Sequence, residues 1–209
     1  MSSYNVFLKH PFTMVISGPT GCGKTTLVQN LLNSRSQVIY PPPNITSYFF
    51  GEHQRSFLSM KDVRFYEGLD DLNSIKFGEP HLIIIDDLMS EASKSEQISN
   101  LFTKGSHHRN VSVILLIQNF FSRGEQLRNI TLNAHYVVLF KNPRDKTIAR
   151  SIACQMYPTK VQGFQRAYEL ATENPFSYFF IDLKPKTPES LRLLSNVLGE
   201  ERFISVYKI

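Results

Sequence analysis

The chain alternates between short apolar runs and segments in which apolar residues recur every three or four positions. Continuous apolar runs predict strands covered on both faces, and the recurring pattern predicts helices with one buried face. Strands are expected at 12–17, 47–50, 63–66, 81–85, 111–117, 136–140 and 178–182. Helices are expected at 24–33, 93–104, 124–129, 143–156 and 159–172. This alternation predicts an α/β fold with a mainly parallel central sheet and helices on both of its faces.

Two further patterns concern the edges of this sheet. Residues 36–40 predict an edge strand that ends at three prolines, 41–43, because proline fits poorly inside helices. After Pro188 a C-terminal helix and a last short strand are expected. No internal repeat, low-complexity tract or linker interrupts the chain, so residues 1–209 are expected to form one domain with a C-terminal tail over 185–209.

The composition indicates a folded protein with an excess of positive charge. Hydrophobic residues make up 42% and charged residues 20%, which excludes a disordered chain. The net charge of +5 favours a polyanionic partner such as nucleic acid. Two cysteines form neither a disulfide framework nor a metal-ligand pattern, so a reducing compartment is expected. There is no signal-peptide segment, and no apolar run approaches the roughly 20 residues of a membrane span.

A glycine-rich segment follows the first predicted strand. Residues 18–25 match the phosphate-binding pattern G-x-x-x-x-G-K-[ST], between a strand and a helix. Its glycines let backbone N–H groups turn toward phosphate oxygens, and the helix N-terminus adds the positive end of its dipole. The predicted nucleotide-binding residues are Gly18, Pro19, Thr20, Gly21, Cys22, Gly23, Lys24, Thr25 and Thr26. Lys24 is expected to reach the β- and γ-phosphates of ATP, and Thr25 to supply a hydroxyl to Mg²⁺.

Two adjacent aspartates, Asp86 and Asp87, follow the apolar run at 81–85. Adjacent carboxylates repel each other, so the pair indicates a nearby cation. Asp86 is expected to hold the hydration shell of Mg²⁺, and Asp87 to act as the general base that polarises the attacking water. Most motor ATPases carry glutamate at the second position. The structural alternative is that the aspartates cap a helix.

The predicted strand at 111–117 ends in two uncharged amides, Gln118 and Asn119. In ATPases with a strand between the phosphate-loop strand and the acidic strand, the tip of that extra strand lies beside the γ-phosphate. A neutral amide there can bond phosphate and attacking water without adding charge. Gln118 is therefore the predicted γ-phosphate sensor, with a structural cap as the alternative, and Asn119 is expected to turn the chain. This arrangement favours a motor ATPase.

Four segments together resemble the poxvirus-type DNA-packaging ATPases of the FtsK–HerA group. They are the phosphate loop, LIIIDDLM at 82–89, SHHRNVSVILLIQN at 106–119 and FKNPRDKTIARSIACQMYP at 140–158. The resemblance covers roughly residues 7–160 and departs from the group where Asp87 stands in place of the commoner glutamate. It implies a RecA-like ATPase fold, with ATP and Mg²⁺ as cofactors.

The same resemblance implies binding partners and a subcellular location. Relatives in large DNA viruses, virophages and Maverick-type elements are homo-oligomeric rings that move double-stranded DNA into a preformed capsid. The implied partners are double-stranded DNA, other copies of the chain and a capsid vertex or portal protein, with no membrane span. The implied location is the cytoplasmic or nuclear assembly site of an infected cell, or the virion.

A ring ATPase completes each site with an arginine from the neighbouring subunit. Arg109, just before the strand at 111–117, is the first candidate, and Arg123 and Arg128 are the second. A solvated loop cation is the alternative for Arg109. Two basic clusters are candidates for contacts with DNA phosphates, with solvated faces as the alternative. The first holds Lys141, Arg144, Lys146 and Arg150, and the second Lys184 and Lys186.

Other functions remain open at this point. A nucleotide or nucleoside kinase carries an arginine-rich lid, which is not evident here, and hydrolysis of ATP without an acceptor would exclude it. A helicase-like P-loop ATPase acting on nucleic acid is a second alternative. A non-catalytic assembly factor that uses nucleotide as a switch is a third, and the acidic pair argues against it.

Overall fold

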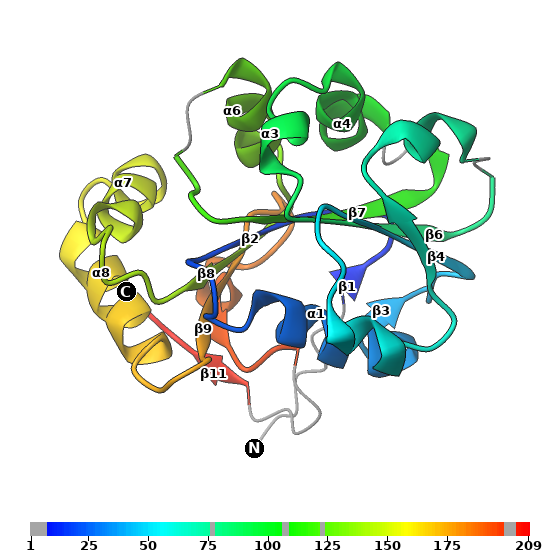
Figure 1. Cartoon of the computed structure of the whole chain (residues 1–209). Helices are drawn as coiled ribbons and strands as arrows, with labels where there is room; N and C mark the ends of the chain where they lie inside the picture. Colours follow the sequence, from blue (N-terminus) through cyan, green and yellow to red (C-terminus); the bar gives the residue numbers. More distant parts are fainter. Residues whose placement is uncertain (1–7, 76–77, 106–108, 122–123, 199–203) are drawn as a thin grey trace.

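The computed structural model describes residues 8–75, 78–105, 109–121, 124–198 and 204–209. A nine-stranded sheet runs through it with helices on both faces (Figure 1). The strand order is β11-β10-β9-β8-β2-β7-β6-β4-β5. The strands are β2 Thr13–Ser17, β4 Ile45–Phe50, β5 Arg64–Glu67, β6 His81–Asp86, β7 Val111–Ile117, β8 Tyr136–Phe140, β9 Tyr178–Asp182, β10 Leu193–Ser195 and β11 Ser205–Val206.

The six strands from β5 to β8 pair in parallel, and β9, β10 and β11 continue the sheet in antiparallel pairing. The mainly parallel α/β sheet predicted from the alternation of elements is therefore confirmed. β7 lies between β2 and β6, as expected for the strand that carries the two amides. Consequently the carboxyl ends of β2, β7 and β6 are neighbours at one edge of the sheet.

Helices cover both faces of the sheet because its buried strands are apolar on both sides. Val113 and Leu115 of β7 belong to the core shared with α3, α4, α6, α7 and α8, whereas Ile114 and Leu116 belong to the core shared with α1. The helices are α1 Lys24–Asn33, α2 Arg35–Val38, α3 Met89–Ala92, α4 Glu96–Asn100, α6 Glu125–Leu132, α7 Thr147–Met156 and α8 Val161–Ala171. Short 3₁₀ segments are η1 Arg55–Ser59, η2 Asp70–Ser74 and η4 Glu189–Leu191, and η3 Leu101–Gly105 is a π-helical turn.

The single helix expected at 93–104 is divided. α3 ends before residue 93, and the region expected as one helix consists of α4, which begins after Ser95, followed by the π-helical turn η3. The Ser95 hydroxyl accepts a hydrogen bond from the Ile98 amide at 3.2 Å, so this side chain caps α4 and fixes where it starts. Among the described residues, no helix has the length and apolar character that crossing a membrane requires.

Two expectations at the sheet edges are wrong. Residues 36–40 form mostly the short helix α2, and only β3 Ile39–Tyr40 is extended, paired with β1 Leu8–Lys9 in a separate two-stranded sheet. The expected C-terminal helix is replaced by η4 and by β10, which pairs with β9. Leu193 and Leu194 are buried in the two cores on opposite faces of the sheet, which a strand allows and a surface helix does not.

Candidate active site at the carboxyl edge of the sheet

A cavity of about 470 Å³ lies at the carboxyl ends of β2, β6 and β7. Its walls come from the loop after β2, the first turn of α1, the segments after β4 and β6, the tip of β7 and the loop before β9. The lining residues are Thr20, Gly21, Gly23, Lys24, Thr25, Thr26, Glu52, Gln54, Asp86, Asp87, Met89, Leu116, Ile117, Gln118 and Phe176. Most residues predicted from separate motifs therefore meet in one place; Gly18, Pro19 and Cys22 belong to the same loop without lining the cavity.

The glycine loop leads from β2 into α1 with a conformation that requires glycine. Gly23 has a φ of 104°, a left-handed value that side chains disfavour. A Cβ on Gly18 would lie 2.7 Å from the Cβ of Phe140, so the loop packs closely on the end of β8. The first N–H groups of α1 have no acceptors within the helix, and its first turn holds no acidic residue. This helix end suits an anion such as a phosphate.

Lys24 brings a positive charge to the same loop. Its Nζ donates hydrogen bonds to the carbonyl oxygens of Gly18 at 2.6 Å and Pro19 at 3.0 Å. These bonds hold the side chain over the loop, where it lines the cavity. An ammonium group beside unpaired helix amides provides the charge and the donors that a polyphosphate needs.

Asp86 is a buried carboxylate, with 4% of its surface exposed, at the end of β6. Its Oδ2 accepts hydrogen bonds from the Thr25 hydroxyl at 3.1 Å and the Tyr48 hydroxyl at 2.7 Å. Burial raises the pKa of Asp86, while these two hydrogen bonds and the charge of Lys24 act in the opposite direction. A divalent cation next to this carboxylate would favour its charged form.

Oxygen donors of this kind suit Mg²⁺. The Thr25 hydroxyl and the Asp86 carboxylate are adjacent, and both are hard ligands. Within the described ranges no group of three or more His, Cys, Asp or Glu side chains could hold a metal ion. The pair of Thr25 and Asp86 fits Mg²⁺, which usually binds one or two protein groups and completes its shell with water and phosphate oxygens.

Asp87 lies in a strained turn directly after β6. Its φ is 57°, in the left-handed region that aspartate adopts at some cost. A Cβ on Gly51 would lie only 2.5 Å from the Asp87 carbonyl oxygen, so glycine is needed where the two turns cross. The Asp87 side chain is exposed to the cavity, and the Gln118 amide donates to its Oδ1 over a long 3.5 Å. The Asp87 carboxylate and the Gln118 amide thus lie together in the cavity that the phosphate loop also lines.

The two amides after β7 have different surroundings. The Asn119 side chain accepts a hydrogen bond from the Phe121 amide at 3.1 Å, a local turn of the kind that asparagine favours. The expectation that Asn119 turns the chain is confirmed. Gln118 lines the cavity instead, next to Asp87.

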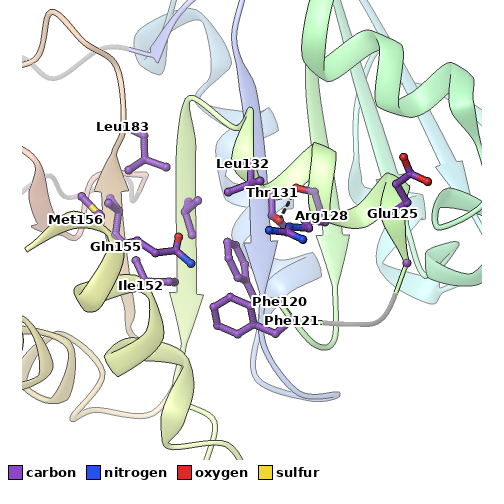
Figure 2. Close-up of a pocket in the computed structure, with 13 residues that line it drawn as sticks. Phe120, Phe121, Glu125, Arg128, Thr131, Leu132, Ile152, Gln155, Met156 and Leu183 are labelled. Carbon is purple, nitrogen blue, oxygen red and sulfur yellow. Dashed lines mark hydrogen bonds between the residues drawn. The ribbon is translucent and has the colours of Figure 1, made fainter. Parts of the chain in front are cut away.

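Two of the candidate trans-acting arginines, Arg109 and Arg128, lie outside this cavity. Arg109 precedes β7, whose seven residues extend about 20 Å, so it lies at the opposite edge of the sheet. Arg128, on α6, lines a separate cleft of about 790 Å³. Figure 2 shows Phe120 and Phe121 on one side of this cleft and residues of α7 on the other. Arg123 lies outside the described residues, as do His107 and His108, which precede Arg109 in the sequence.

The two basic clusters differ in accessibility. Lys141 and Lys146 line a pocket of about 460 Å³ next to α8. Lys184 is partly buried and bonded to the Tyr136 hydroxyl, and burial lowers its pKa to about 8. Lys186 is exposed. The first cluster is therefore the more accessible to a polyanion.

The motifs miss two aromatic residues at the site. Tyr48 donates to Asp86 from β4, and the only signal in the sequence is a hydroxyl-bearing residue near the end of a predicted strand. Phe176 lies in the segment Asn-Pro-Phe-Ser before β9, where a proline indicates a turn but nothing indicates its distance from the phosphate loop.

No protein-family model and no curated protein matches the sequence of this chain. Solved structures with a similar fold do match it. The genome-packaging NTPase B204 of Sulfolobus turreted icosahedral virus 2, bound to ATP-γS, aligns over 95% of this chain and 97% of its own, with 15% identity and a TM-score of 0.54. The fold is that of a P-loop NTPase.

Two further structures share this fold. B204, the DNA-packaging ATPase of Sulfolobus turreted icosahedral virus, has 12% identity and a TM-score of 0.57, covering 95% of this chain and 98% of its own. The cytoplasmic domain of the type VII secretion ATPase EccC from Thermomonospora curvata has 14% identity and a TM-score of 0.55. It aligns over 88% of this chain but only 25% of its own.

Proposed function

We propose that this chain is an ATP-driven double-stranded DNA translocase that packages a viral genome into a preformed capsid. The observation that carries the proposal is the meeting of phosphate loop, buried aspartate, strained aspartate and amide in one cavity. The fold shared with B204, which is named a DNA-packaging ATPase, supports the choice among P-loop enzymes.

The proposed hydrolysis uses the residues of this cavity in separate roles. Lys24 and the first amides of α1 bind the phosphates and neutralise their charge. Asp87 accepts a proton from the attacking water while the water oxygen forms a bond to the γ-phosphorus. The bond between the γ-phosphorus and the β–γ bridging oxygen breaks, and ADP leaves with the electrons of that bond. Thr25 and Asp86 hold Mg²⁺, which supplies charge neutralisation at the phosphates when bound with ATP.

Gln118 is the proposed sensor of the γ-phosphate. Its amide already bonds Asp87 at the long distance of 3.5 Å, so a small movement could exchange this partner for phosphate or water. Because β7 continues into Phe120 and Phe121, a shift at its tip reaches the cleft of Figure 2 directly. This continuity gives a route from nucleotide state to the rest of a ring.

The remaining parts of the proposal concern partners. We propose a homo-oligomeric ring in which Arg109 completes the site of a neighbour, with Arg123 and Arg128 as alternatives. DNA phosphates would meet the basic cluster of Lys141 and Lys146, which is open to solvent. A capsid vertex or portal protein in the infected cell would receive the motor.

A triplex-displacement assay tests this function on the purified chain. A labelled third strand is annealed to a linear duplex, and its release is followed with Mg²⁺ and ATP. We expect release with ATP and none with a non-hydrolysable analogue. If ATP is consumed only when a nucleoside or nucleotide acceptor is added, and the third strand stays bound, the protein is a kinase and the translocase proposal is wrong.

A further inference from the structure

A four-residue turn, Asn174–Ser177, joins α8 to β9 and carries an unusual residue. The Ser177 amide and hydroxyl both donate to the Asn174 carbonyl, at 3.2 and 2.7 Å. Proline occupies the second position of this turn, and Phe176 the third with a φ of 63°. Turns with positive φ at the third position ordinarily place glycine or asparagine there. A bulky side chain in this conformation destabilises the turn by about 1–2 kcal/mol.

The ring of Phe176 is also poorly buried. Its exposed fraction is 72%, so hydrophobic burial within the chain does not offset the backbone strain. The strain does place the ring at a specific point. A Cβ on Gly23 would lie 3.2 Å from Cδ1 of this ring, so the ring lies against the residue just before α1.

Phe176 separates two adjoining pockets. It lines the cavity that holds Lys24 and Asp86, and it lines a smaller pocket of about 280 Å³ on the other side. Gly21 belongs to both, which joins them at the phosphate loop. Beyond the two shared residues, the smaller pocket is lined by Cys22, Phe140, Lys141, Pro143, Glu173, Asn174, Pro175 and Ser177. It therefore offers an aromatic wall together with charged and amide groups.

A nucleotide bound by this loop needs a place for its base. The phosphates occupy the loop and the acidic side of the cavity, so the nucleoside extends past the start of α1, where the ring of Phe176 lies. Planar bases stack on exposed aromatic rings, and this is worth about 1–3 kcal/mol per base. We propose that Phe176 is the platform on which a purine nucleoside triphosphate stacks its base, with the small pocket receiving the base edge. This inference rests on the proposed nucleotide site of the glycine loop.

The test compares ATP with tripolyphosphate, which has the same phosphate chain and no base. Binding of each to the full-length protein with Mg²⁺ is measured by calorimetry for wild type, Phe176→Gly, Phe176→Leu and Phe176→Tyr. The glycine variant removes the ring and relieves the strained φ, so it should fold. We expect ATP to bind about 5- to 100-fold more weakly to the Gly and Leu variants, with Tyr near wild type. Tripolyphosphate should bind all four equally.

A fluorescent variant gives a second readout. The chain contains no tryptophan, so Phe176→Trp introduces a single reporter at this position. We expect ATP to quench its emission on stacking and tripolyphosphate to leave the emission unchanged. UTP, with the smaller pyrimidine, should bind wild type more weakly than ATP, and this difference should disappear in Phe176→Gly.

Three outcomes overturn the inference. Equal losses of ATP and tripolyphosphate affinity would show that Phe176 only shapes the phosphate loop. Unchanged ATP affinity in Phe176→Gly would show that the ring contacts no base. A wild-type protein that binds neither ligand would overturn the nucleotide site itself. By contrast, base-dependent binding without release in the triplex assay would reject the translocase and leave the platform in place.

Discussion

Both edges of the parallel sheet carry polar residues, but their surroundings differ. At the amino edge several polar side chains are hydrogen-bonded in pairs, although the buried Nδ1 of His81 has no partner among the described residues. At the carboxyl edge the polar side chains also line a cavity. The amino-edge pairs are His10 with Ser112, Thr13 with His135 and Ser47 with His81. Polar groups bonded to one another at the amino edge stabilise the fold, whereas polar groups that line the cavity are available to a ligand.

The His10 network illustrates the amino edge. His10 bonds the Ser112 hydroxyl at 2.6 Å through Nδ1 and the side-chain Oδ1 of Asn110 at 3.0 Å through Nε2. The same hydroxyl accepts the Phe12 amide at 3.1 Å. Burial lowers the pKa of His10, which keeps the ring neutral at pH 7. A buried network satisfied in this way stabilises the fold.

The carboxyl edge combines a buried carboxylate with left-handed residues that line a cavity, whereas at the amino edge the left-handed Asn110 is bonded to His10. Asp87 and Phe176 adopt left-handed φ values, and burial raises the pKa of Asp86. Such features reduce the free energy of unfolding, so they persist where a ligand or reaction uses them. The contrast predicts that mutations at the two edges act on different properties.

The largest predicted effect is a loss of ATP hydrolysis at Arg109. It would be an exception to the contrast between the edges, because Arg109 precedes β7 and lies at the amino edge. If it completes a neighbour's site, Arg109→Ala should bind ATP but hydrolyse it about 10³- to 10⁵-fold more slowly. Mixing Arg109→Ala with Lys24→Ala subunits should restore part of the activity, because some interfaces join an intact pocket to an intact arginine.

Arg128→Ala is the matched control for Arg109, since Arg128 lies in the cleft beyond the carboxyl edge. Flat activity at every mixing ratio, with ring assembly confirmed by light scattering, would remove Arg109 from the site. If the loss and its recovery follow Arg128→Ala, the neighbour's arginine comes from the cleft.

Lys24→Ala should lose both nucleotide affinity and hydrolysis, because the lysine charge is used in ground and transition states. We expect turnover to fall by about 10³-fold. Phosphate release and nucleotide binding measure the two losses, and Lys61→Ala, at an exposed position after η1, is the control. Normal turnover in Lys24→Ala would contradict the phosphate-loop assignment.

Asp87→Asn should keep Mg²⁺·ATP binding and lose about 10²-fold in turnover, as for removal of a general base. Asparagine also tolerates a left-handed φ, so the turn should stay intact. Glu52→Gln is the comparison, because Glu52 lines the same cavity from the end of β4. A loss confined to Glu52→Gln would move the base to that residue.

Stability changes at the two edges should have opposite signs. His10→Ala leaves Ser112 and Asn110 without their partner and should destabilise the protein by about 1–3 kcal/mol without changing turnover of the folded enzyme. Asp86→Asn should raise the melting temperature of the nucleotide-free protein by a smaller amount, since the amide oxygen can still accept from Thr25 and Tyr48.

The sign for Asp86 follows from its raised pKa. The native state keeps this proton to higher pH than the unfolded chain, whose value is near 3.8, so stability falls as pH rises through the interval between the two pKa values. Asp86→Asn should remove this dependence while abolishing hydrolysis. Thermal melts of wild type, His10→Ala and Asp86→Asn across the interval between the two pKa values measure these changes. A melting temperature for Asp86→Asn below that of wild type at neutral pH would contradict the prediction.

The sequence predicts the parts of the site that are local. A glycine loop between strand and helix, and polar residues at the ends of apolar strands, define Lys24, Asp86 and Gln118 because parallel strands end at a common edge. Tyr48 and Phe176 escape this reasoning, since their contacts depend on strand register and on a turn more than 150 residues from the loop. β10 escapes it because pairing with the neighbouring strands β9 and β11 makes that segment extended.

Steady-state ATP hydrolysis with and without linear duplex DNA, measured on wild type and Gln118→Ala, tests the central assignment of the carboxyl edge most directly. The account predicts Mg²⁺-dependent turnover that DNA accelerates in wild type, without any phosphate acceptor. Gln118→Ala should bind ATP almost normally, hydrolyse it about 10-fold more slowly and respond little to DNA, because its amide acts when the γ-phosphate geometry changes. A wild-type protein that binds ATP but releases no phosphate with or without DNA would contradict it, as would normal DNA stimulation in Gln118→Ala.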